Sequence, residues 1–95
     1  MIVRISGEGQ FELDDQAAHR LDELDNQLVD ALNADDAEAF RSGLEETVRF
    51  VGQRGRPVAH DRVVPSDVII PPPDIDLEEA RQFFTDEGLM APLPA

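Results

Sequence analysis

The sequence predicts a mainly α-helical domain with a small β-hairpin, an α+β fold. Two apolar stripes at helical spacing, separated by a turn of only a few residues, predict an antiparallel two-helix hairpin. Strand-forming residues on both sides of a glycine-containing turn predict the β-hairpin. Prolines around an apolar stretch exclude a helix over residues 64–73 and predict an extended, proline-rich ribbon. A chain of 95 residues is expected to form a single domain, 1–95, around one modest core.

The N-terminal two-stranded hairpin is expected to comprise residues 2–6 and 9–13, which flank Gly7-Glu8-Gly9. The apolar residues of these segments are strand formers, and the two glycines allow a positive φ in the connection. Two strands alone are marginally stable in water, so we expect the hairpin to pack against a helix.

The first long helix is expected to begin at Asp14 or Asp15, either of which suits the N-cap, and to end at about Asn33. Apolar residues recur along it at intervals of three and four, which marks one buried face. The opposite, acidic face is expected to lie in solvent and to include Asp22, Glu23, Asp25 and Asp30.

The second helix is expected to begin at Asp35, because Asp35 and Glu38 have the spacing of a capping box, and to end near Gly55. A short third helix is predicted after the ribbon, where Asp76 and Glu79 repeat that spacing. Gly88 is well placed to end this helix, and the tail of about 89–95 is expected to fray.

Two interpretations of the ribbon remain open. It either packs on the protein's own helices as a tether, or it is offered to a partner. In the second case its contact residues would be Val63, Val64, Val68, Ile69 and Ile70. We expect Ser66, just before Asp67, to form a local turn bond to the backbone.

The chain is strongly acidic, with 21 acidic residues against 8 basic ones and a net charge of −13. This charge argues against nucleic acid and anionic membrane surfaces as ligands, because both need cationic patches. All basic residues are arginine, and four of them lie between residues 49 and 62. These arginines either neutralise the acidic helices, those near Gly55 also suiting the negative end of the second helix, or form a cationic spot for an acidic partner or a lipid phosphate. In the second case Arg54, Arg56 and Arg62 would be the charged rim.

No motif for catalysis or metal binding is found. The chain has no cysteine, and its two histidines, His19 and His60, lack the spacing of a metal site. No acid–base pair or nucleophile motif is present, so we expect no enzyme, no catalytic residue, no cofactor and no metal. No apolar run is long enough to cross a membrane, and no signal peptide is evident, so we expect a cytoplasmic protein without direct membrane insertion.

Three stretches resemble the PspA-associated family (PspAA), small proteins encoded beside phage-shock protein A homologues. They are Met1-Ile2-Val3-Arg4-Ile5-Ser6-Gly7-Glu8-Gly9-Gln10-Phe11, Leu21-Asp22-Glu23-Leu24-Asp25-Asn26, and Val64-Pro65-Ser66-Asp67-Val68-Ile69-Ile70-Pro71-Pro72-Pro73-Asp74. The ending Asp86-Glu87-Gly88-Leu89 fits as well. Their order and spacing extend over most of the chain.

This resemblance implies a non-enzymatic adaptor of the envelope-stress, phage-shock-like response. Its partner would be a PspA/Vipp1-like, coiled-coil, membrane-associated protein, which would place the adaptor peripherally at the inner membrane through that partner. The alternative is a self-assembling structural protein, a homo-oligomer that joins through the hairpin edge or the ribbon. The resemblance transfers no catalytic residue.

Overall fold

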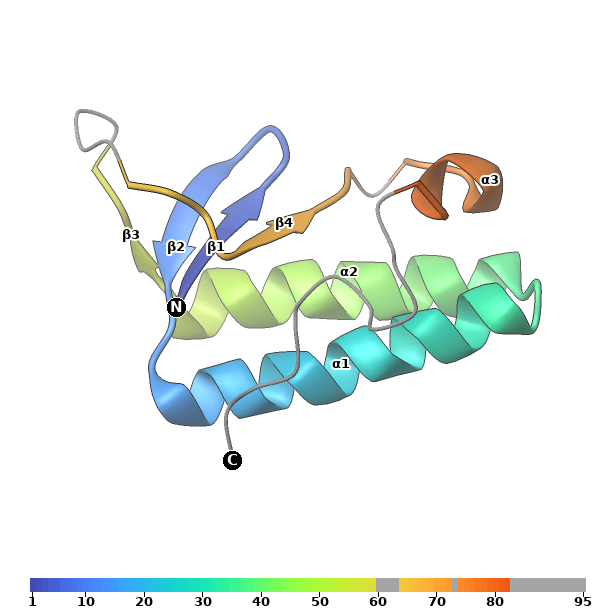
Figure 1. Cartoon of the computed structure of the whole chain (residues 1–95), viewed down its shortest axis with the longest axis horizontal. Coiled ribbons are helices and arrows are strands. Elements are labelled where there is room, and N and C mark those ends of the chain that lie inside the picture. The colour runs from blue at the N-terminus through green and yellow to red at the C-terminus, as the bar shows by residue number, and fades with distance from the viewer. Residues whose placement is uncertain (60–63, 73, 83–95) are drawn as a thin grey trace.

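The computed structural model describes residues 1–59, 64–72 and 74–82, which form a pair of helices with a four-stranded sheet on one side (Figure 1). The predicted α+β fold, with its hairpin, helix pair and short third helix, is confirmed. Arg62, Val63, His60, Gly88 and the tail lie outside the described residues. The elements in chain order are β1 (Ile2–Ile5), β2 (Gly9–Glu12), α1 (Asp15–Asn33), α2 (Ala37–Arg54), β3 (Arg56–Pro57), β4 (Val68–Ile70) and α3 (Leu77–Ala80).

The sheet is larger than the predicted hairpin, because strands β3 and β4 extend it on either side in the order β3-β2-β1-β4. β4 is the middle of the predicted ribbon, and it pairs in parallel with β1. The other two pairings are antiparallel. The ribbon therefore contributes backbone hydrogen bonds to the sheet, in addition to the Val68 and Ile70 side chains that it buries in the core.

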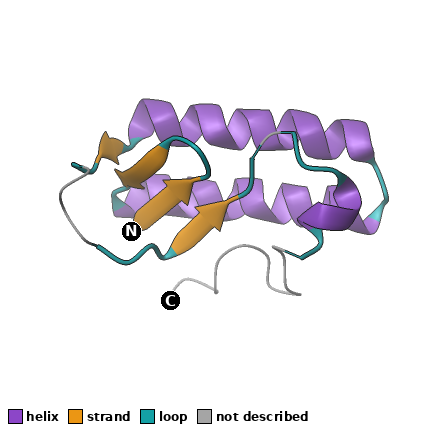
Figure 2. Ribbon diagram, turned by 90° about the horizontal axis from the view of Figure 1, so that it is seen from above, coloured by secondary structure: helices purple, strands orange, loops and turns teal. Residues whose placement is uncertain are grey.

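The faces of the sheet follow the period-two alternation of a strand. Val3 and Ile5 on β1 are buried against the helices, whereas Arg4 between them is exposed on the outer face. Seen from above, the strands lie over the helix pair at the end where the chain begins, and α3 lies toward the other end (Figure 2).

Of the two long helices, α1 has a cap that the sequence allowed, whereas the cap of α2 differs from the prediction. Asp14 caps α1, since its carboxylate accepts the backbone N–H of Ala17 at 2.8 Å. The cap of α2 is Asp36, one residue later than predicted, and its carboxylate accepts the N–H of Ala39 at 3.0 Å. Asp35 cannot serve, because its φ of 54° lies in the left-handed region and a cap needs extended backbone.

One residue predicted for the acidic face of α1 was placed wrongly. Asp25 is 2% exposed, so it belongs to the buried face of the helix. The physical reason is its spacing: it lies four residues after Leu21 and three before Leu28, on the same stripe as both. The charge of Asp25 had suggested a solvent-exposed side chain, but its position on the apolar stripe places it in the buried face.

The two long helices pack closely along this stripe. A Cβ atom at Gly43 of α2 would lie only 3.0 Å from the Leu28 side chain of α1, so glycine permits the close approach. One turn further along α2, the buried Thr47 hydroxyl donates to the Gly43 carbonyl at 2.7 Å, which satisfies its hydrogen bond inside the helix. The hydrophobic core lies between the sheet and the helices. Its fully buried side chains include Ile5, Leu21, Leu28, Leu44, Val51 and Ile70.

The short helix α3 is held at the far end of the helix pair. Its N-cap is Asp76, as predicted, with the carboxylate accepting the N–H of Glu79 at 2.8 Å. The Arg81 guanidinium donates to the Leu32 carbonyl at 3.1 Å and to the Asp35 carboxylate. Since Leu32 lies in the last turn of α1, Arg81 also places positive charge where the helix dipole favours it.

Candidate partner-binding surface

The predicted ribbon residues are divided between the core and the surface. Val68 and Ile70 are 2% and 0% exposed, so both side chains lie in the core. Ile69, between them, is 47% exposed and points to the outer face of the sheet. Val64 is half-buried. Of the four predicted ribbon contacts that the structure describes, Ile69 is therefore the best placed to meet a partner.

The ribbon is fastened to the hairpin before it becomes β4. The Gln10 side-chain amide donates to the Val64 carbonyl and to the Ser66 hydroxyl, both at 2.8 Å. Ser66 thus accepts a bond from a residue distant in sequence, where we had expected a local turn bond. These contacts lie on the outer face of the sheet, because Gln10 pairs with the outward-facing Arg4.

Asp67 makes the second fastening, at the start of β4. Its carboxylate accepts the Ile2 N–H at 2.8 Å, and its own N–H donates to the Ile2 carbonyl at 2.8 Å. The side chain thereby extends the hydrogen bonding between β1 and β4 beyond the paired residues. Two of the stretches that resemble the PspA-associated family, the chain's opening and the ribbon, are therefore direct neighbours in the fold.

Most arginines of the predicted cationic group make no ion pair inside the described chain. There the ion pairs join Arg20 to Glu23 and Glu46, and Arg81 to Asp35. Arg54 instead lies over the Phe50 ring, 5.8 Å from its centroid. Arg56 on β3 is the cross-strand neighbour of Glu12 without forming an ion pair with it. Neutralisation by ion pairs thus lacks support for Arg54 and Arg56 within the described chain, whereas Arg54 does lie in the last turn of α2, where the helix dipole favours a positive charge.

Arg4 is a further exposed arginine without an ion pair in the described chain, and it was not among the candidate residues predicted from the sequence. It is the cross-strand partner of Ile69 in the parallel β1–β4 pair, and both side chains are exposed on the outer face. We call these two residues the Arg4–Ile69 patch. The alternation of the first strand already placed Arg4 opposite the buried side, but nothing local indicated that Ile69 would lie next to it.

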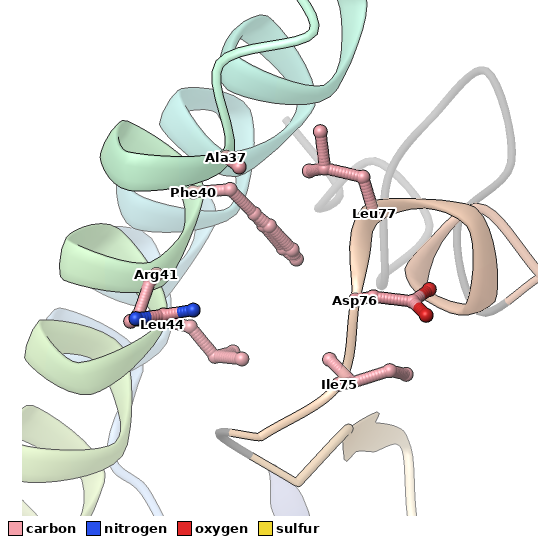
Figure 3. Close-up of a pocket in the computed structure, with 7 residues that line it drawn as sticks. All are labelled: Ala37, Phe40, Arg41, Leu44, Ile75, Asp76 and Leu77. Carbon is pink, nitrogen blue, oxygen red and sulfur yellow. The ribbon is translucent and has the colours of Figure 1, made fainter.

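A small pocket lies elsewhere, between α2 and the segment that leads into α3 (Figure 3). Its volume is about 100 Å³, and apolar side chains form much of its lining. Small-molecule sites are commonly ~300–1,000 Å³, so this pocket is too small for a typical metabolite. The residues around it are Ala37, Phe40, Arg41, Leu44, Ile75, Asp76 and Leu77.

Among the described residues that line this pocket, Asp76 is the one carboxylate, and it serves the local helix. Asp76 caps α3, and its side-chain hydrogen bond and negative charge raise the pKa of Glu79 above its usual value. Both carboxylates are exposed, so solvent screens their repulsion and the consequence for stability is small. We find no acid–base pair at this pocket.

The described residues offer neither a metal-binding cluster nor a membrane-spanning helix. Within residues 1–59, 64–72 and 74–82, no group of three or more His, Asp or Glu side chains is arranged to hold a metal ion. None of the described helices has the length and apolar character needed to cross a bilayer. His19 is exposed on α1, as expected of a surface histidine.

Comparison with known proteins identifies the family. The model of the family described as PspA-Associated protein (PspAA) matches residues 1–92. No curated protein and no solved structure matches the chain. The match includes the hairpin, both long helices, the ribbon and α3. The chain therefore belongs to the PspA-associated protein family.

Proposed function

We propose that this protein is a non-enzymatic adaptor that binds a PspA/Vipp1-type coiled-coil protein in an envelope-stress response. The family name, which is that of a PspA-associated protein, supports this partner. The observation that carries the proposal is the exposed Ile69 with the exposed Arg4 beside it, an arginine that makes no ion pair with the described residues of this strongly acidic chain. A long helix with charges of both signs would find complementary groups on such a surface.

The pocket between α2 and the segment before α3 suggests no chemistry for this protein to perform. The pocket in Figure 3 holds no pair of groups that could transfer a proton. The exposed polar residues of the described chain include helix caps, such as Asp14 and Asp36, whose carboxylates are engaged by backbone N–H groups. We therefore assign these carboxylates structural roles and propose no catalytic residue.

The direct test is a binding measurement with the purified PspA-type protein from the same genome. We expect a complex at 50 mM NaCl whose affinity falls roughly tenfold at 500 mM NaCl, because salt screens the charge complementarity. Isothermal titration calorimetry at the two salt concentrations measures this. An unrelated coiled coil of matching length and net charge serves as the control, and equal binding to it, or no binding to the PspA-type protein at low salt, contradicts the proposal.

The alternative function is self-assembly, and one observation favours it. β4 forms an edge of the described sheet, and it carries the exposed Ile69. The hairpin edges that we had considered for this role are already paired with β3 and β4. Light scattering during size-exclusion chromatography separates the two functions: an adaptor is monomeric alone and enters a larger complex only with its partner, whereas a structural protein assembles by itself.

A further inference from the structure

The Arg4–Ile69 patch combines an exposed apolar side chain with an exposed cation. At 47% exposure, Ile69 is the exposed large hydrophobic residue of the described chain. Its neighbour Arg4 is also exposed and makes no ion pair with the described residues, although the chain carries 21 carboxylates. An exposed isoleucine and an arginine without an ion pair in the described chain therefore lie side by side on the outer face of the sheet.

The ribbon leaves this patch open while it covers the residues around it. Gln10 and Ile2 lie on the same outer face and are half-buried, and both are bonded to the ribbon. Arg4 lies between Gln10 and Ile69 in the register of the sheet. The fastened ribbon thus forms a border next to the patch, and the same bonds hold β4 in the register that presents Ile69.

We propose that the Arg4–Ile69 patch is the anchor for a helix of the partner that presents an apolar side chain and a carboxylate one turn apart. Directly opposite residues in a sheet lie ~5 Å apart, and residues i and i+4 on a helix lie ~6 Å apart, so the two pairs match in spacing. The apolar side chain covers Ile69, and the carboxylate accepts hydrogen bonds from the Arg4 guanidinium. This inference rests on the proposed function.

A second copy of the chain is a poorer occupant. Two chains of net charge −13 repel each other at low salt. β4 is only three residues long, and Pro71 and Pro72 follow it directly, which makes it a poor template for pairing with another strand. A mixed-charge helix needs no strand pairing and brings the carboxylate that Arg4 lacks.

The test compares affinities for the purified PspA-type protein in 50 mM NaCl, using Arg4→Gln, Ile69→Thr and the double variant. Threonine keeps the β-branched shape that suits a strand, and glutamine keeps most of the length of arginine. We expect each single variant to bind roughly tenfold more weakly and the double variant to lose less than the product of the two, since both residues contact one helix. Arg41→Gln, an exposed arginine of α2 that makes no ion pair in the described chain and lies outside the 49–62 group, is the matched control and should bind within twofold of wild type.

The outcomes separate the anchor from the function itself. If wild type binds and both single variants bind within twofold of it, the anchor is overturned while the adaptor function stands. If wild type does not bind, both fall. If wild type is a dimer that Ile69→Thr splits, the occupant is a second copy and the inference is overturned. Circular dichroism checks that each variant is folded. If Ile69→Thr does not fold, the affinity of Arg4→Gln alone still decides whether the anchor holds.

Discussion

Ile70→Ala is expected to lower the free energy of unfolding by about 2–5 kcal/mol, the usual cost of deleting a buried isoleucine side chain. Ile70 is 0% exposed and belongs to the core between the sheet and the helices. A small domain has a total stability of only ~5–10 kcal/mol, so this variant should be largely destabilised. Urea denaturation followed by circular dichroism measures the change.

The adjacent residue supplies the control for Ile70→Ala. Ile69 belongs to the same three-residue strand but is 47% exposed, so Ile69→Ala should cost less than about 1 kcal/mol. Equal destabilisation by the two variants would contradict the alternation of β4 that places Ile69 on the surface. The contrast therefore tests the register on which the partner-binding surface depends.

Gly55→Ala should destabilise the protein by about 1–3 kcal/mol, because no space exists for the added methyl group. A Cβ atom there would lie 2.7 Å from the Val51 carbonyl oxygen and 2.8 Å from the Cβ atom of Phe11. The Val51 carbonyl also accepts the Gly55 N–H at 2.8 Å, so relief of the clash disturbs the end of α2. The turn from α2 into β3 would have to move.

Gly52→Ala is the matched control for that substitution. Gly52 lies in α2 and is exposed, and a Cβ atom added there would have no neighbouring atom within 4 Å. Alanine favours a helix over glycine by about 0.5–1 kcal/mol, so this variant should be more stable than wild type. If Gly55 is needed because a side chain does not fit there, the thermal unfolding midpoint should fall for Gly55→Ala and rise for Gly52→Ala. Shifts of the same sign would contradict this explanation.

The sequence predicted the elements that depend on local signals. The helix pair follows from apolar spacing, and the cap Asp76 follows from residue type beside that spacing. For α1, residue type narrowed the cap to Asp14 or Asp15, and the structure selects Asp14. The cap of α2 was missed by one residue because Asp35 and Asp36 are chemically alike, and only backbone conformation distinguishes them. Asp25 was misplaced because we weighed its charge above its position on the buried stripe.

The candidate site could be predicted only in part. Prolines around Val68, Ile69 and Ile70 correctly indicated an extended segment. Its parallel pairing with β1 joins residues 65 positions apart, as in Val3 and Val68, and no local pattern encodes such a contact. For this reason the sequence could not show that Ile69 alone of the three faces outward, or that Arg4 lies beside it.

Amide hydrogen exchange, followed by mass spectrometry with and without the purified PspA-type protein, tests the central claim most directly. Exchange slows where a partner covers the surface or stabilises the local fold. We predict slower exchange in residues 64–72 and 2–5 of the complex, with little change on the exposed acidic side of α1. A complex in which only α1 and α2 exchange more slowly, while amides of the ribbon and β1 exchange as fast as in the free protein, would contradict this claim.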